Sequence, residues 1–111
     1  MSDIKAPGRF GDFWPHYLAA HLDPRTRAAH YFGTVLGVVL LVLFAMGAGW
    51  WLLPLAVVAG YGPAWGGHAL FEHNRPATFD HPLWSFLADF RMLFLWATGE
   101  LGVEIERLGL H

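Results

Sequence analysis

The chain has 111 residues, which is enough for a single domain. Hydrophobic residues make up 55% of it and charged residues only 14%, against roughly 25% charged residues in an average soluble domain. The formal net charge is −2 and the seven lysines and arginines form no patch, so no nucleic-acid partner is expected. Cysteine is absent, which excludes disulfides and thiolate metal ligands.

The N-terminal part is expected to precede the membrane rather than enter it. Residues 1–9 are polar and predict a flexible tail before a single helical membrane domain over residues 10–111. Residues 10–22 mix aromatic and polar side chains, which is typical of a short helix lying in the membrane interface. A cleaved signal peptide is not expected, because the apolar run starts only after about thirty residues.

A long uncharged run dominates the middle of the sequence. No Asp, Glu, Lys or Arg occurs from residue 28 to residue 71, a stretch of 44 positions. A helix that crosses the hydrocarbon core needs about 20 apolar residues, so this run holds two spans and a turn. We expect the spans over Pro24–Gly47 and Trp51–His73, with Asp23 as the N-cap of the first. A buried hairpin of a soluble bundle is disfavoured, because so small a domain could not cover it.

The remaining sequence predicts a loop over residues 74–82 and then a third membrane helix over Leu83–Leu108. This helix carries Asp89 and Arg91, and the sequence leaves open whether it crosses the membrane or is re-entrant. The expected fold class is therefore all-α, an integral membrane helical bundle. It would consist of a two-span hairpin, an interfacial N-terminal helix and a third C-terminal membrane helix.

Basic residues flank the apolar run on one side of the predicted hairpin. Lys5, Arg9, Arg25 and Arg27 precede the first span, and Arg75 follows the second. By the positive-inside rule, this distribution places the N-terminus and the loop over residues 74–82 on the cytoplasmic side.

This topology brings several histidines to one membrane face. His30 lies near the cytoplasmic start of the first span, His68 near the cytoplasmic end of the second, and His21 just before the first. Glu72 follows His68 by four residues and shares its helix face, whereas His73 points away. Imidazole and carboxylate are ligands of zinc and non-haem iron, so the cluster suits a divalent metal. The alternative is that each histidine only bonds a neighbour at the interface.

Two sequence blocks carry a family resemblance. One runs from Phe13 (Phe-Trp-Pro-His-Tyr-Leu-Ala-Ala-His) to Thr34, and the other is Gly-His-Ala-Leu-Phe-Glu-His-Asn-Arg-Pro-Ala-Thr-Phe from Gly67 to Phe79. Over roughly residues 10–95, the chain resembles the membrane family of metabolism-of-phytosphingosine-to-odd-numbered-fatty-acids proteins. The fungal member of that family is a 2-hydroxy fatty acid dioxygenase. The Asn-Arg-Pro-Ala-Thr-Phe version is similar to a bacterial branch.

The resemblance implies an Fe(II)-dependent α-oxidation, in which O2 converts a 2-hydroxy fatty acid to an acid one carbon shorter with release of CO2. It places His21, His30, His68 and Glu72 on the family's histidine and glutamate positions. We expect the three histidines to bind iron, because three protein ligands leave room on octahedral iron for the hydroxy acid and O2. Glu72 is then expected beside the ligands or as a catalytic base, and an alternative set has Glu72 in place of His21.

Further expectations follow from the same resemblance. Arg75 and Arg27 are expected to bind the substrate carboxylate. The acyl chain would lie among the apolar spans in contact with membrane lipid. A bacterial inner membrane is the expected location, with the site on its cytoplasmic side. Two other functions stay open: a haem protein with His30 and His68 as axial ligands, and a lipid-binding membrane protein without catalysis.

Overall fold

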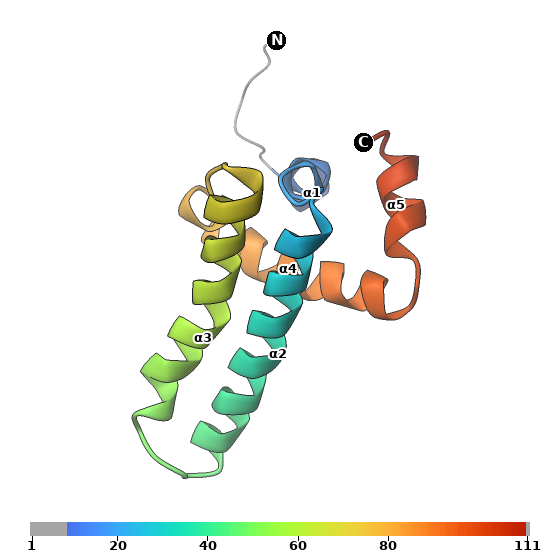
Figure 1. The fold of residues 1–111 in the computed structure, drawn as a ribbon. Coiled ribbons are helices and arrows are strands. Elements are labelled where there is room, and N and C mark those ends of the chain that lie inside the picture. Colours follow the sequence, from blue (N-terminus) through green and yellow to red (C-terminus); the bar gives the residue numbers. More distant parts are fainter. Residues whose placement is uncertain (1–8, 111) are drawn as a thin grey trace. The chain divides into compact units, whose positions relative to one another are not determined.

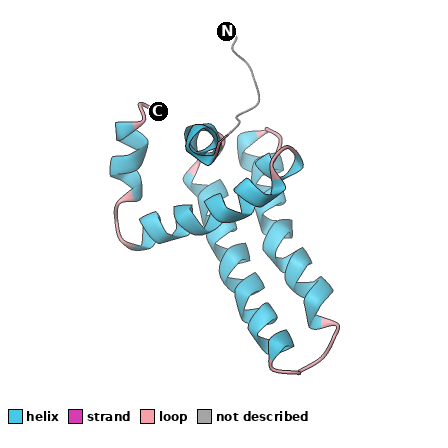
Figure 2. Ribbon diagram, turned by 180° about the vertical axis from the view of Figure 1, so that it is seen from behind, coloured by secondary structure: helices cyan, strands magenta, loops and turns pink. Residues whose placement is uncertain are grey.

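The computed structural model describes residues 9–110, and all regular structure within them is helical (Figures 1 and 2). This confirms the all-α prediction, while the tail predicted for residues 1–9 lies outside the described residues except for Arg9. The α-helices are α1 (Phe10–Ala19), α2 (Pro24–Ala45), α3 (Leu52–Gly67), α4 (Pro82–Ala97) and α5 (Leu101–Arg107). A π-helical turn, His68–Glu72, follows α3, and a 3₁₀ turn, Ala77–Phe79, precedes α4.

The chain divides into two compact units, which are described in turn. One is the segment from His21 to Pro76, which contains α2, α3 and the π turn. The other combines α1 with the chain from Ala77 onward. The single helical domain over residues 10–111 stays a prediction.

Helix α2 begins as its sequence predicts. The Asp23 carboxylate accepts a hydrogen bond from the backbone N–H of Arg25 at 2.8 Å, and Pro24 occupies the first helical position. The Arg25 guanidinium also contacts this carboxylate at 2.9 Å, and these hydrogen bonds hold the pKa of Asp23 below its usual value. At the other end, Gly47 takes a left-handed φ of 85°, which ends the helix two residues before the predicted boundary.

Small residues let α2 and α3 pack side by side as an antiparallel hairpin (Figure 1). A Cβ atom on Gly33 would lie only 2.7 Å from the carbonyl oxygen of Gly60. A Cβ atom on Gly67 would lie 3.2 Å from the Cα atom of Thr26. The two backbones therefore approach most closely where no side chain intervenes, as small-residue interfaces between membrane helices do. This approach occurs next to His30 and His68.

The outward face of the hairpin is apolar. An 18-residue stretch of helix α2 has a mean hydropathy of 2.1, and only 17% of this stretch is buried. The core helix of a soluble protein, in contrast, is largely covered by other parts of the protein. Within the described residues, α2 is the helix that is long and apolar enough to cross a membrane by length and composition. The structure thus supports one candidate span, and the predicted membrane bundle with further spans stays a prediction.

The predicted continuous helix over Leu83–Leu108 is wrong. The chain breaks between α4 and α5 because Gly99 takes a left-handed φ of 78°. The Gly99 and Glu100 N–H groups donate back to carbonyls of the last turn of α4, which is the Schellman pattern of helix ends. The 16 residues of α4 extend about 24 Å, less than the roughly 30 Å of a hydrocarbon core. A third spanning helix is therefore not confirmed.

A polar cluster joins the helices of this second unit. The Trp14 indole N–H donates to the Glu104 carboxylate at 2.7 Å, and Arg107 contacts the same carboxylate at 2.9 Å. Hydrogen bonds from Arg107 and Trp14 lower the pKa of Glu104. The Arg91 guanidinium lies 4.5 Å from the centre of the Trp14 ring, a cation–π contact. These contacts hold α1, α4 and α5 together.

Asp89 of α4 should make the stability of the protein depend on pH. Burial raises the pKa of its carboxyl to about 7, although a hydrogen bond from the Tyr17 hydroxyl acts in the opposite direction. Because the folded-state pKa lies above the unfolded one, the protonated carboxyl stabilises the fold at low pH. That contribution is lost as the pH rises from about 4 to about 7.

The Asp89→Asn variant tests this expectation, since a neutral amide cannot ionise. The unfolding temperatures of wild type and variant should be measured in detergent at pH 5, 6, 7 and 8. The difference between the two unfolding temperatures should decrease as the pH falls. A difference that is constant across this range would contradict the assignment.

Candidate metal centre

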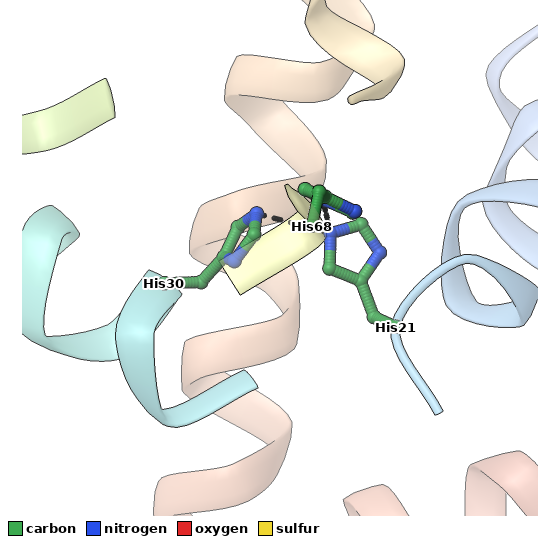
Figure 3. Close-up of side chains that lie close together, drawn as sticks. All are labelled: His21, His30 and His68. Carbon is green, nitrogen blue, oxygen red and sulfur yellow. Dashed lines mark hydrogen bonds between the residues drawn. The ribbon is translucent and has the colours of Figure 1, made fainter. Parts of the chain in front are cut away.

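Three buried histidines from separate segments of the first unit meet at one point (Figure 3). His21 lies in the loop between α1 and α2, His30 in the second turn of α2, and His68 at the start of the π turn. Their exposed fractions are 0%, 5% and 1%, respectively. The antiparallel hairpin thus brings His30 and His68 to the same level, as the sequence predicts, and the loop adds His21.

The spacing of the ring nitrogens fits a metal ion. The Nε2 atom of His21 lies 3.0 Å from Nε2 of His30 and 2.9 Å from Nε2 of His68. Two imidazole nitrogens that bind one metal at right angles, with bonds of about 2.1 Å, lie about 3.0 Å apart. One ligand nitrogen from each of the three residues lies within 4.8 Å of the others. The donor set is therefore preformed.

Hydrogen bonds on the outer nitrogens orient two of these rings. Nδ1 of His30 lies 3.0 Å from the carbonyl oxygen of Thr26, which only accepts, so Nδ1 carries the proton. Nδ1 of His68 donates to the amide oxygen of Asn74 at 2.6 Å. Both rings therefore direct an Nε2 lone pair toward His21, whose single Nε2 proton could satisfy only one of them. A metal cation satisfies all three nitrogens at once, and such outer hydrogen bonds are typical of metal-bound histidines.

The π turn explains how Asn74 reaches His68. The turn ends at His73, which is exposed and left-handed with a φ of 57°. The backbone N–H groups of His73 and Asn74 both donate to the carbonyl oxygen of His68. A left-handed residue other than glycine costs about 1–2 kcal/mol, and π turns are frequent at functional sites. The local backbone thus brings the Asn74 side chain back onto the ring of His68.

A family model matches the part of the chain that contains all three histidines. The model described as 2-hydroxy-palmitic acid dioxygenase Mpo1-like matches residues 8–101. The chain belongs to this family. No curated protein and no solved structure matches the chain. The match confirms the family that the sequence resembles, and it places a dioxygenase description beside a buried cluster of three histidines.

Two of the other polar residues expected at the site of this Mpo1-like protein, Glu72 and Arg27, lie against the loop that carries His21. Glu72 is half-buried and its Oε2 atom accepts a hydrogen bond from the backbone N–H of Asp23 at 2.6 Å. Arg27 donates through Nη1 to the carbonyl oxygens of His21 and Leu22 at 2.8 and 3.0 Å. Both side chains thus contact the loop that carries His21. Arg75 is exposed at the end of the hairpin.

Asn74 is the residue that the sequence reasoning did not identify as part of the site. Its signal was its place in the Gly67–Phe79 block, two residues after Glu72. Helical register could not find it, because Asn74 reaches His68 only through the π turn and the left-handed His73.

Proposed function

We propose that this Mpo1-like protein is an Fe(II)-dependent dioxygenase that converts a 2-hydroxy fatty acid and O2 to a fatty acid one carbon shorter, CO2 and water. One observation carries the proposal: the Nε2 atoms of three buried histidines converge at metal-ligand spacing. The family description supplies the class of substrate, since it names 2-hydroxy-palmitic acid. His21, His30 and His68 are the proposed iron ligands.

The reaction balances with O2 as the only oxidant. The bond between C1 and C2 of the hydroxy acid breaks, C1 leaves as CO2, and C2 becomes the new carboxyl carbon. The substrate gives up four electrons, which reduce one O2 molecule, and the surplus hydrogen leaves as water. Bound iron supplies the redox chemistry that lets O2 react with the hydroxy acid.

The residues of the chain hold the ligands and exclude water. Thr26 and Asn74 fix the proton on Nδ1 of His30 and His68, so that Nε2 of each ring carries the lone pair that would bind metal. Burial of all three rings keeps bulk water from the ligand nitrogens. Arg75, exposed beyond the π turn, is proposed to attract the substrate carboxylate, with Arg27 as a second cation. The apolar surface of the hairpin would receive the acyl chain.

Turnover with a defined substrate tests the function. Protein purified in detergent without oxygen and loaded with one Fe(II) per chain should consume O2 with 2-hydroxypalmitic acid. The products should be pentadecanoic acid and CO2 in equal amounts. Palmitic acid, which lacks the 2-hydroxyl group, should give no turnover.

Three outcomes would reject the proposal. Equal turnover by protein stripped of metal would exclude the iron site. A strong Soret band from the purified protein would favour the haem protein with His30 and His68 as axial ligands. Lipid binding without any turnover would favour the non-catalytic alternative.

We also propose that the hairpin crosses a bacterial inner membrane twice, with the histidines on the cytoplasmic side. Helix α3 and the π turn together run without a break from Leu52 to Glu72, 16 and 5 residues, or about 31 Å. Exposed apolar side chains on both helices support contact with lipid. The basic residues near the end of the hairpin that carries the histidines support placing this end on the cytoplasmic side.

Cysteine labelling tests this topology, since the natural chain has no cysteine. Ala48→Cys at the tip of the hairpin should react with an impermeant thiol reagent added to intact spheroplasts. His73→Cys, which is also exposed in the structure, should react only after the membrane is opened. Labelling of both positions from outside would reject the two-span arrangement.

A further inference from the structure

The three histidines of the cluster are not held in the same way. His30 and His68 belong to helical segments that pack against each other in the hairpin. His21 belongs to the short loop before α2 and lies outside any helix, while Asp23 at the end of this loop accepts the first backbone hydrogen bonds of α2. Its place in the cluster must therefore depend on contacts that hold the loop.

Glu72 makes one of these contacts. Its carboxylate accepts the hydrogen bond from the backbone N–H of Asp23, two residues after His21. The distance of 2.6 Å is that of a short, charge-assisted hydrogen bond. Glu72 ends the π turn that His68 begins, so this bond joins the loop directly to the segment that carries another of the histidines.

Arg27 makes the other contact from α2. One guanidinium nitrogen donates to the carbonyl oxygens of both His21 and Leu22. Arg27 lies one turn before His30 on the same helix, so this contact ties the loop to the third histidine segment. The loop is thus held on both sides, its N–H group by Glu72 and its carbonyls by Arg27.

We propose that Glu72 and Arg27 form a clamp on residues 21–23 and are positioning residues for His21. The proposal rests on the metal site proposed above and assigns these residues a role in it. Glu72 then acts as a hydrogen-bond acceptor for backbone, neither as a metal ligand nor as a catalytic base. The geometry favours this role, because the cluster is complete with three imidazoles and Glu72 faces the loop backbone.

The clamp and its alternatives differ in what they require of residue 72. A ligand or a base needs the carboxylate, which the Gln side chain lacks. A clamp needs only an oxygen that accepts a hydrogen bond, which Gln retains and Ala does not. Glu72→Gln and Glu72→Ala therefore form the decisive pair. Glu106→Ala, an exposed glutamate on α5, is the matched control.

Amide hydrogen exchange of the metal-free protein in detergent tests the clamp itself. Glu72→Ala should speed exchange of the Asp23 amide at least about tenfold, because it removes the acceptor of a charge-assisted hydrogen bond. Glu72→Gln and Glu106→Ala should exchange at nearly the wild-type rate. Unchanged protection of amides in the middle of α2 shows that a variant is folded. An Asp23 amide as protected in Glu72→Ala as in wild type would overturn the clamp.

Cobalt(II) titration, followed by the visible absorption of the bound ion, tests the consequence for His21. Glu72→Ala should bind cobalt about 10–100-fold more weakly, the usual cost of losing a residue that orients a ligand. Glu72→Gln should stay within about fivefold of wild type, since a neutral acceptor forms a weaker bond by about 1 kcal/mol. A Glu72→Gln affinity as low as that of Glu72→Ala would overturn the positioning role and favour a ligand.

Arg27→Ala provides an independent test of the clamp. If Arg27 holds the loop, cobalt affinity should fall about 10–100-fold, as in Glu72→Ala. If Arg27 serves only to attract the substrate carboxylate, KM should rise while cobalt affinity stays unchanged, and its part in the clamp would be rejected. A wild-type protein that binds no cobalt would reject the metal site, whereas the exchange experiment would still decide the clamp.

Discussion

His30→Ala and His68→Ala should each abolish iron binding and turnover. Each variant removes one of three nitrogens that converge on a single point, and each does so from a different helical segment. Loss of an outer hydrogen-bond partner costs about 10–100-fold in metal affinity, and loss of a ligand should cost more. Iron per chain after gel filtration and O2 uptake with 2-hydroxypalmitic acid measure the two effects.

The matched control for these variants is His73→Asn. His73 follows the same turn but is exposed, and asparagine tolerates its left-handed backbone. This variant should retain the iron content and activity of wild type. Full activity in His30→Ala or His68→Ala would reject the metal centre.

The sequence predicted the pairing of His30 and His68 for a simple physical reason. Two positions near the same end of an antiparallel hairpin must lie at similar depth, whatever the details of packing. The start of α2 was predictable in the same way, since Asp23 and Pro24 have the chemistry that a helix N-terminus requires. Local composition is sufficient for such features.

The contact between Glu72 and Asp23 could not be predicted from the register of Glu72. In a regular α-helix, the spacing of four residues would place Glu72 on the same face as His68. The chain instead forms a π turn, and the Glu72 carboxylate lies against the N–H group of Asp23, 49 positions away in sequence. The periodicity of a sequence does not predict a contact of this kind, because the contact depends on the path of the loop.

The break between α4 and α5 was missed for a related reason. Residues around Gly99 continue an amphipathic pattern, and one glycine within a helical pattern costs only about 1 kcal/mol. The deciding feature is the left-handed conformation of Gly99. It lets the N–H groups of Gly99 and Glu100 donate to carbonyl oxygens of the preceding turn. The sequence pattern of one helix with a central glycine is nearly the same as that of two helices joined at a glycine.

The close approach of α2 and α3 leads to the second large effect, which is expected from Gly33→Ala. The added Cβ atom would lie 2.7 Å from the carbonyl oxygen of Gly60, a backbone atom that cannot rotate away. The helices must therefore separate, and overpacking of this kind costs about 1–3 kcal/mol. Because His30 lies one turn before Gly33 and His68 follows α3, separation also pulls these two ligands apart. We expect a lower unfolding temperature together with weaker cobalt binding.

Gly62→Ala is the control for this prediction, because it makes the same chemical change in the partner helix. A Cβ atom at Gly62 meets nothing within 4 Å, and alanine favours a helix over glycine by up to about 1 kcal/mol. Gly62→Ala should therefore leave cobalt affinity unchanged and leave the unfolding temperature equal or higher. Equal cobalt affinities in Gly33→Ala and Gly62→Ala would show that the glycine contact does not set the distance between His30 and His68.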